Sequence, residues 1–215
     1  MNILTASAEA APFAKAGGLA DVAAYLPVEW QKLGQNPVVI MPKYASVDTA
    51  YYGFRPTFLV LYVPMGGWTE FAHLWQGTFP GSNAPVYLIE NNDYFNRPGI
   101  YGDGREYGDN DRRFIFFSRA VFEAAKALDF NPDIIHAHDY HAAFTMAFLK
   151  SWYRFDPRFS GAGGVFTIHN LAYQGKFNPA RAMEYSGFGI KEAYTGSWFE
   201  HQGAVNAMKT GIMFA

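Results

Sequence analysis

The chain has 215 residues, of which 50% are hydrophobic and 18% are aromatic. This length and composition allow a full hydrophobic core and exclude a disordered chain. The formal net charge is −2, so no basic field indicates a nucleic acid or an anionic membrane as a partner. Cysteine is absent, which excludes disulfides and thiolate metal sites. No apolar run reaches about 18 residues and no signal-peptide pattern is found, so we expect a cytoplasmic protein.

Short apolar runs alternate with helical patterns along the chain. We expect buried strands at 3–8 and 38–41. Between them, apolar residues from Leu19 to Leu33 recur at spacings of three and four, which predicts one helix. Pro27 lies inside that pattern and predicts a kink or a late break. A strand, a helix and a strand in this order predict a parallel pair with a right-handed crossover.

The middle of the chain has a different pattern. Apolar runs at 58–63, 71–75 and 86–89 are separated by turns rich in glycine and proline. These runs predict a β-hairpin added to the parallel sheet. The loop 91–108 that follows is long and polar, and loops of this length in compact domains tend to be functional or mobile.

Regular alternation returns in the second half. We expect a helix capped at 109–111, strands at 134–138 and 164–168, and helices at 142–153 and 199–209. The last four residues, 212–215, suggest the start of a buried strand. Natural domains usually end on exposed polar segments, so the chain looks cut. The predicted class is α/β, Rossmann-like, with a mainly parallel sheet and one domain over 1–215.

The first polar feature is the loop Lys15-Ala16-Gly17-Gly18-Leu19-Ala20-Asp21, between the first strand and the first helix. Ligands of open parallel sheets bind beyond the carboxyl ends of the strands. Paired glycines let a ligand approach the backbone, a helix N-terminus favours an anion, and Lys15 suits a phosphate. An ordinary strand-to-helix turn is the alternative. The loop matches neither the dinucleotide pattern nor a Walker A loop, and we expect no bound cofactor.

The second feature is His136-Ala137-His138-Asp139-Tyr140-His141, at the end of a predicted strand. Three histidines and an aspartate can form a metal site, a hydrogen-bonding site for a polyhydroxylated ligand, or a set of core histidines with satisfied hydrogen bonds. The aspartate falls one place earlier than in the H-x-H-x-D-H pattern of metallo-hydrolases. This difference favours the hydrogen-bonding site, with no metal.

The third feature is Thr167-Ile168-His169-Asn170-Leu171-Ala172-Tyr173-Gln174-Gly175. A predicted strand delivers His169 and Asn170 into a loop that also contains Tyr173 and Gln174. Imidazole, carboxamide and phenol groups hydrogen-bond sugar hydroxyls, and aromatic faces stack on pyranose rings. The loop therefore suits a carbohydrate.

Together, and in this order, these motifs resemble those of bacterial glycogen synthases and plant starch synthases. Glu9, Arg97-Pro98-Gly99-Ile100-Tyr101-Gly102 and Asn110-Asp111-x-Arg113-Phe114 belong to the same resemblance, which runs from Met1 to Ala215. It implies a GT-B architecture, in which two Rossmann-like domains face each other across a cleft. The chain would be the N-terminal, acceptor-side domain, and the C-terminal nucleotide-binding domain would be absent.

The resemblance further implies retaining transfer of glucose from ADP-glucose, or UDP-glucose, to the non-reducing end of an α-1,4-glucan. No cofactor is needed, because the nucleotide-sugar is a substrate. The residues that read the base would lie in the absent domain, so the isolated chain is expected to be inactive. The alternatives are a stand-alone glucan-binding module and a metal-dependent hydrolase that uses His136, His138 and His141.

The resemblance assigns roles residue by residue. Lys15 with the amides of Gly17 and Gly18 would bind the donor phosphates, His169 would orient the transferred glucose, and Asp139 would act from the acceptor side. The remaining assignments are Asp21 on the donor side, His141 and Phe95 on the acceptor side, and Glu9, Asn170, Tyr173 and Gln174 as supporting residues.

Two positions depart from the family pattern. Ala16 stands where the family usually has threonine, so a side-chain hydroxyl is lost while the backbone amides remain. Phe95 stands where many members have tyrosine, so a phenol contact to the acceptor is lost while ring stacking could survive.

Overall fold

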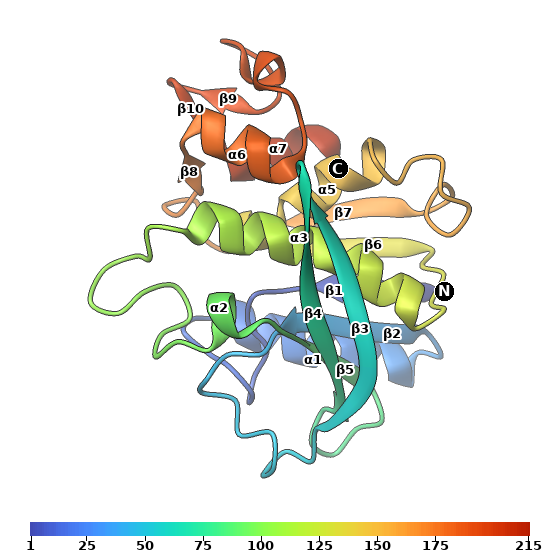
Figure 1. The fold of residues 1–215 in the computed structure, drawn as a ribbon. Helices are drawn as coiled ribbons and strands as arrows, with labels where there is room; N and C mark the ends of the chain where they lie inside the picture. The colour runs from blue at the N-terminus through green and yellow to red at the C-terminus, as the bar shows by residue number, and fades with distance from the viewer.

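A seven-stranded sheet runs through the molecule in the order β3-β4-β5-β2-β1-β6-β7 (Figure 1). The computed structural model describes all of residues 1–215. Strands β5, β2, β1, β6 and β7 are parallel, whereas β3 and β4 are antiparallel to each other and β4 is antiparallel to β5. The predicted α/β class, the parallel sheet and the β-hairpin are confirmed.

The elements fall into a large sheet, its helices and a small C-terminal sheet. The large sheet comprises β1 (Asn2–Ala6), β2 (Asn36–Pro42), β3 (Arg55–Met65), β4 (Trp68–Thr78), β5 (Pro85–Glu90), β6 (Ile134–His138) and β7 (Gly163–Thr167). The helices are α1 (Leu19–Lys32), α2 (Asn92–Phe95), α3 (Asn110–Ala127), α4 (Asp139–Ala142), α5 (Phe144–Lys150), α6 (Pro179–Ser186), the 3₁₀ helix η1 (Ile190–Ala193) and α7 (Ala207–Phe214). The small sheet has the order β8-β10-β9 and comprises β8 (Lys176–Phe177), β9 (Glu200–His201) and β10 (Ala204–Asn206).

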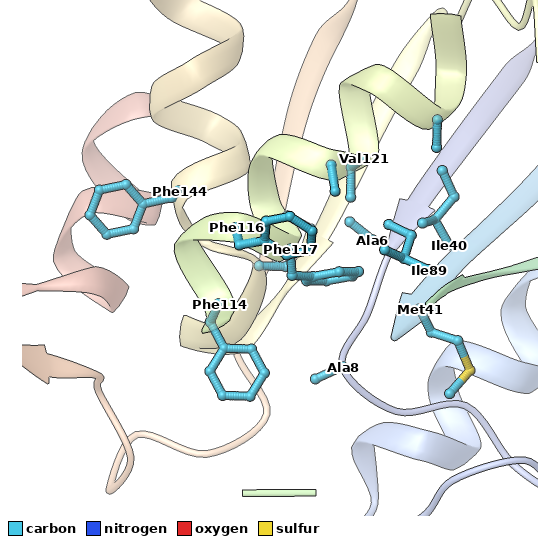
Figure 2. Close-up of a cluster of buried hydrophobic side chains, with 14 of the residues drawn as sticks. Ala6, Ala8, Ile40, Met41, Ile89, Phe114, Phe116, Phe117, Val121 and Phe144 are labelled. Carbon is cyan, nitrogen blue, oxygen red and sulfur yellow. The ribbon is translucent and has the colours of Figure 1, made fainter. Parts of the chain in front are cut away.

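The central strands are almost wholly apolar because helices cover the sheet on both faces, with α3 on one face and α1 on the other (Figure 1). Figure 2 shows Phe116, Phe117 and Val121 of α3 pointing towards Ala6 of β1 and Ile40 of β2. All five side chains are fully buried. Because β1 and β6 pair in parallel, their carboxyl ends lie together on one side of the sheet.

Helix α1 follows the predicted pattern but does not stop at Pro27. It runs from Leu19 to Lys32 with Pro27 inside it, so the helix is not broken at Pro27. Proline lacks one backbone N–H and therefore removes one helical hydrogen bond without ending the rest of the ladder. None of the helices combines the length and apolar character needed to cross a bilayer.

The last seventeen residues differ from the prediction. Residues 207–214 form helix α7, not a strand, and the first part of the predicted helix at 199–209 is replaced by β9, β10 and the turn between them. The side chain of Asn206 caps α7 by accepting the amide of Lys209 at 2.9 Å. Ile212 and Met213 are 53% and 40% exposed. The buried-strand argument for a cut chain is therefore wrong.

Candidate functional site

A cavity of ≈ 710 Å³ opens beyond the carboxyl ends of β1, β6 and β7, and it is called the cleft below. This is the edge at which parallel sheets bind ligands. The structure places most of the predicted site residues in its wall, namely Glu9, Gly17, Gly18, Asp139, His141, His169, Asn170 and Tyr173. Segments far apart in the sequence, from Glu9 to Tyr173, thus line one space.

The glycine loop is held from within the chain by Glu9. Oε2 of Glu9 accepts the amides of Ala16 and Gly17 at 2.5 and 3.0 Å, and Tyr101 donates its hydroxyl to Oε1. Glu9 is 3% exposed. The Gly17 amide, predicted to face a phosphate, is therefore occupied by a buried carboxylate. The amide of Gly18, at the N-cap of α1, has no partner among the hydrogen bonds of the chain.

The two glycines of this loop are not required by the backbone. Gly18 has φ −70° and ψ −19°, and Gly17 also lies outside the left-handed region. A Cβ atom added at either position would meet no atom within 4 Å. Both positions border the cleft, so the lack of side chains leaves open space next to the N-terminus of α1.

Lys15 is paired with Asp21 at the outer side of the loop. Its Nζ lies 2.7 Å from both carboxylate oxygens, and the two side chains are 52% and 43% exposed. Ion pairs this exposed contribute little to stability and exchange readily with solvent. Lys15 does not line the cleft, although it directly precedes residues that do.

Asp139 joins the ends of β6 and β7. Its Oδ1 accepts the amide of His169 at 2.7 Å. Asp139 has φ +54°, a left-handed conformation that is uncommon outside glycine and marks a specialised turn. Burial raises the pKa of the Asp139 carboxyl above its ordinary value, and the His169 amide partly opposes the shift.

The histidines of this region are buried and neutral. Burial lowers the pKa of His136 to about 4 and lowers the pKa values of His138 and His141 well below 6.5. His141 stacks on Tyr101 with ring centroids 4.3 Å apart. Nε2 of His136 lies 2.7 Å from Oγ1 of Thr167. No three His, Asp or Glu side chains of the chain are arranged to hold a metal ion, so the hydrolase alternative gains no support.

Besides Lys15 and Asp21, two further predicted residues do not line the cleft. Phe95 is fully buried and packs against Tyr44 and Phe116, so its ring offers no face on which a sugar could stack. Gln174 accepts a hydrogen bond from Asn206 at 2.8 Å and lines a smaller neighbouring cavity of ≈ 370 Å³. The predicted role of Phe95 on the acceptor side is therefore incompatible with its burial.

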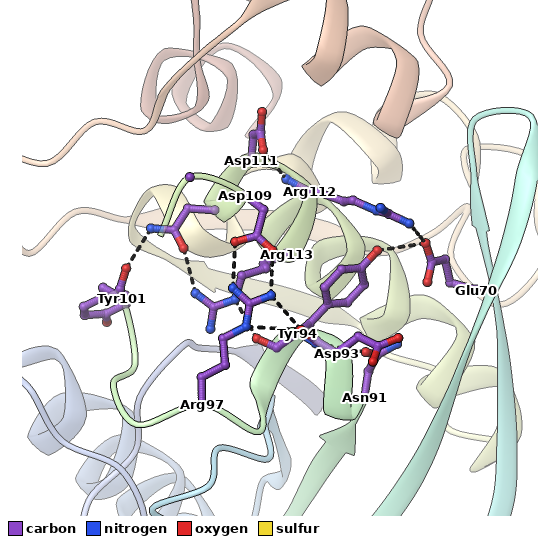
Figure 3. Close-up of polar contacts among 12 residues, drawn as sticks. Glu70, Asn91, Asp93, Tyr94, Arg97, Tyr101, Asp109, Asp111, Arg112 and Arg113 are labelled. Atoms are coloured by element: carbon purple, nitrogen blue, oxygen red, sulfur yellow. Dashed lines mark hydrogen bonds and ion pairs between the residues drawn. The ribbon is translucent and has the colours of Figure 1, made fainter. Parts of the chain in front are cut away.

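The long loop 91–108 supplies cleft residues that sequence reasoning missed, Tyr101, Gly102, Gly104, Arg105 and Glu106. Arginine side chains fix this loop (Figure 3). Arg97 forms an ion pair with Asp109 at 2.7 Å. The fully buried Arg113 donates to the carbonyls of Tyr94 and Ile100 at 2.7 and 3.0 Å. The arginines in two of the family-like motifs were the available signal.

Known proteins resemble this chain along nearly its whole length. Residues 2–215 match the family model of the starch synthase catalytic domain. Glycogen synthase 1 of Geobacter sulfurreducens is 43% identical over 217 residues, which cover 100% of this chain and 43% of the relative. Glycogen synthase of Elusimicrobium minutum is 41% identical over 219 residues, with 100% and 44% covered.

A solved structure also resembles this chain. The catalytic domain of starch synthase IV from Arabidopsis thaliana, bound to ADP and acarbose, has a TM-score of 0.86 and 30% identity, covering 100% of this chain and 43% of that one. The chain thus spans less than half the length of the relatives it matches. With the family model matching nearly every residue, the chain belongs to the glycogen and starch synthase family.

Proposed function

We propose that residues 1–215 form the N-terminal, acceptor-side domain of a GT-B glucosyltransferase. In this proposal the enzyme moves glucose from ADP-glucose to an α-1,4-glucan with retention. The observation that carries the proposal is the open space at Gly17 and Gly18, beside a helix N-terminus in the cleft. The fold does not need glycine there, so the space suits a ligand that comes close to the backbone.

The donor diphosphate would lie at the start of α1. The amide of Gly18 and the positive end of the α1 dipole attract an anion. Lys15 can leave its exposed pair with Asp21 and turn to a phosphate. These groups would stabilise the negative charge that grows on the leaving diphosphate as the glycosidic bond breaks. Glu9 keeps the loop in shape by holding the neighbouring amides. The Arabidopsis neighbour is bound to ADP and acarbose, which supports a nucleotide-sugar and a glucan as the substrates.

The sugar groups would lie at the other side of the cleft. His169 is held by Asp139 through its amide and by His138 through its ring. It would orient the transferred glucose as a hydrogen-bonding partner. Asp139 would orient sugar hydroxyls from the acceptor side, with the buried His141 ring behind it. Asn170 and Tyr173 line the same cleft.

The proposal includes a second domain and no cofactor. The relatives are more than twice the length of this chain. Half of the donor site would be supplied by that second domain, and transferase turnover depends on both halves closing on the substrates. We therefore expect the 215-residue chain to show no glucose transfer by itself. A cytoplasmic location belongs to the same proposal.

The experiment compares two proteins in the incorporation of labelled glucose from ADP-glucose into glycogen. One is the 215-residue chain. The other, called the fusion protein below, joins this chain to the part of Geobacter sulfurreducens glycogen synthase 1 that lies outside the matched residues. We expect glucose transfer by the fusion protein and none by the 215-residue chain. Robust transfer by the 215-residue chain would contradict the need for a second domain.

A second arm tests the glycine space directly. Gly18→Leu in the fusion protein should weaken ADP-glucose binding at least tenfold, because the side chain fills the space beside the helix N-terminus. Gly34→Leu is not a fair control, since Gly34 has φ +75°. Gly161→Leu is a better one, since it has open space, no left-handed φ and no place in the cleft. Equal donor binding by both variants would refute the proposed donor site.

A further inference from the structure

Two histidine rings from neighbouring strands meet edge to edge behind the cleft. Nδ1 of His138 lies 2.9 Å from Nε2 of His169. His138 ends β6, next to Thr167 of β7 in the sheet register, and it is fully buried. His169 lines the cleft. The other nitrogen of His138, Nε2, is buried and has no hydrogen-bond partner. This unpaired atom determines which nitrogen of each ring carries the proton.

Each neutral imidazole carries one N–H and one bare nitrogen. A hydrogen bond between the rings can therefore form in two ways. Either His138 donates from Nδ1 and keeps a bare Nε2, or His138 accepts at Nδ1 and keeps an N–H at Nε2. The first arrangement buries an unpaired acceptor and the second buries an unpaired donor.

The first arrangement is favoured. Among buried backbone groups, N–H donors without a partner are rarer than incompletely satisfied acceptors, and we extend this preference to the imidazole nitrogens. The ring of His136, 4.1 Å from that of His138 between centroids, covers the site without forming a hydrogen bond to it. Burial also lowers the pKa of His138, in agreement with a neutral ring.

We propose that His138 is a positioning residue that donates its Nδ1 proton to His169 and thereby holds His169 in the Nδ1–H tautomer. The Nδ1 atom of His169 makes no hydrogen bond within the chain and remains available to a ligand. It offers a donor, so the ligand group it recognises must be an acceptor, such as a hydroxyl or phosphate oxygen. A hydroxyl bound in this way keeps its own hydrogen free for a second partner.

The backbone supports this arrangement. The amide of His169 is fixed by Oδ1 of Asp139 at 2.7 Å, while its ring is fixed by His138. The main chain and the side chain are thus held by two consecutive residues at the end of β6. The tautomer argument rests on the contact between the two rings and on the buried, unpaired Nε2 of His138; only the identity of the ligand rests on the proposed function.

The tautomers can be measured by long-range ¹H–¹⁵N correlation spectra of the ¹⁵N-histidine-labelled chain at pH 8. We expect Nδ1 to be protonated in both His138 and His169, with a preference of at least about tenfold. His169 carrying its proton at Nε2 would overturn the proposal. This measurement does not depend on catalysis, so its failure is distinct from a failure of the proposed function.

Three variants test whether His138 sets the tautomer of His169. His138→Asn keeps an amide donor near the Nδ1 position and should leave the His169 tautomer unchanged. His138→Leu removes the donor and should convert His169 to a mixture with substantial Nε2–H. His136→Gln, a matched control, alters the neighbouring ring that bonds Thr167 and should have no effect on His169. An unchanged His169 tautomer in folded His138→Leu would also overturn the proposal. If His138→Leu does not fold, the wild-type spectrum decides.

In the fusion protein, His138→Leu should lower kcat/KM for ADP-glucose about tenfold or more. His138→Asn should recover most of that loss, because it restores the donor without restoring the imidazole. Equal losses in both variants, with equal thermal stability, would show that His138 acts through packing and would overturn the positioning role.

Discussion

The two walls of the cleft differ in how exposed their charged and polar groups are. The loop wall, residues 15–21, carries exposed charge in the form of Lys15 and Asp21, and its backbone is held by Glu9 from behind. The histidine wall is formed by Asp139, His141 and His169, with His136 and His138 behind them. It is mostly buried, and Nε2 of His138 and Nδ1 of His141 have no hydrogen-bond partner. The groups that would neutralise a charged ligand under the proposed function thus lie on the exposed side, where side chains rearrange at little cost. The groups that would orient the ligand lie in the buried part, where rearrangement costs more.

The largest expected effect is the acid sensitivity contributed by the buried histidines. The folded-state pKa of His136 is about 4, and those of His138 and His141 are well below 6.5. In the unfolded chain these rings bind protons below pH 6.5, whereas in the folded chain they do not. The free energy of unfolding is therefore greatest above pH 6.5 and falls as the pH drops towards 4. Each ring contributes up to about 1.4 kcal/mol per pH unit in this window.

Urea denaturation at pH 7.5, 6.5 and 5.5 measures this dependence. Asp139 slightly opposes this pH dependence. Its pKa is raised, so the folded chain binds a proton at a higher pH than the unfolded chain does. The slope of the free energy of unfolding against pH gives the number of protons taken up on unfolding. His141→Gln should reduce this number by about one, and His201→Gln, at an exposed position, should leave it unchanged. A free energy of unfolding that is constant from pH 7.5 to 5.5 would contradict the burial of neutral histidines.

The next effect concerns the support of the loop wall. Glu9→Ala removes the buried acceptor of the Tyr101 hydroxyl and of the amides of Ala16 and Gly17, two exposed residues whose amides water can reach. Since the partly buried Tyr101 hydroxyl is the group left without a partner, we expect a loss of about 1–3 kcal/mol in the free energy of unfolding. Glu9→Gln keeps one acceptor oxygen and should lose less.

The control for Glu9→Ala is Glu29→Ala, which removes an exposed partner of Lys32 and should change stability by less than about 0.5 kcal/mol. Equal stability of the Glu9 and Glu29 variants would mean that Glu9 does not shape the loop. The comparison separates a buried carboxylate with three donors from a surface ion pair.

The general form of both walls could be predicted from the sequence. Apolar runs of four to six residues locate β1, β6 and β7, and parallel strands bring their carboxyl ends together. The polar residues that follow each run therefore had to share one edge of the sheet. The role of Glu9 could not be predicted in this detail, because its contact with the Gly17 amide depends on how the loop folds back over the end of β1.

The errors have physical causes as well. Phe95 occupies a position in a family-like motif, but whether an aromatic ring faces a ligand or the core depends on neighbours distant in sequence, here Tyr44 and Phe116. The run Ile212-Met213-Phe214 is too short for its periodicity to distinguish helix from strand. The capping side chain of Asn206 was the signal for a helix.

A smaller effect on stability, with a large effect on function, is expected at Lys15. Lys15→Ala breaks an exposed ion pair, so the free energy of unfolding should change by less than about 0.5 kcal/mol. In the fusion protein the same variant should lower glucose transfer at least tenfold, which corresponds to about 1.4 kcal/mol of lost transition-state stabilisation. Lys32→Ala, which breaks a similarly exposed pair with Glu29, is the matched control. An unchanged rate in Lys15→Ala would make the lysine structural.

The smallest change in stability is expected for Gly18→Ala. Alanine restricts the unfolded chain, which stabilises by about 0.4–1 kcal/mol, but it is a poorer N-cap than glycine, so the two effects nearly cancel. No atom lies within 4 Å of the added Cβ and the φ of −70° suits alanine. Gly175→Ala is the contrasting variant, because Gly175 has φ +65° and its Cβ would lie 2.4 Å from the Tyr140 ring.

Thermal unfolding should therefore show Gly18→Ala close to the wild type and Gly175→Ala clearly less stable. ADP-glucose affinity of the fusion protein, measured by calorimetry, should fall severalfold in Gly18→Ala although its fold is intact. The added methyl group enters the space next to the free amide of α1 and keeps the diphosphate away from it. Unchanged affinity would mean that this space is not occupied by the donor, and the charged loop wall would lose its place in the donor site.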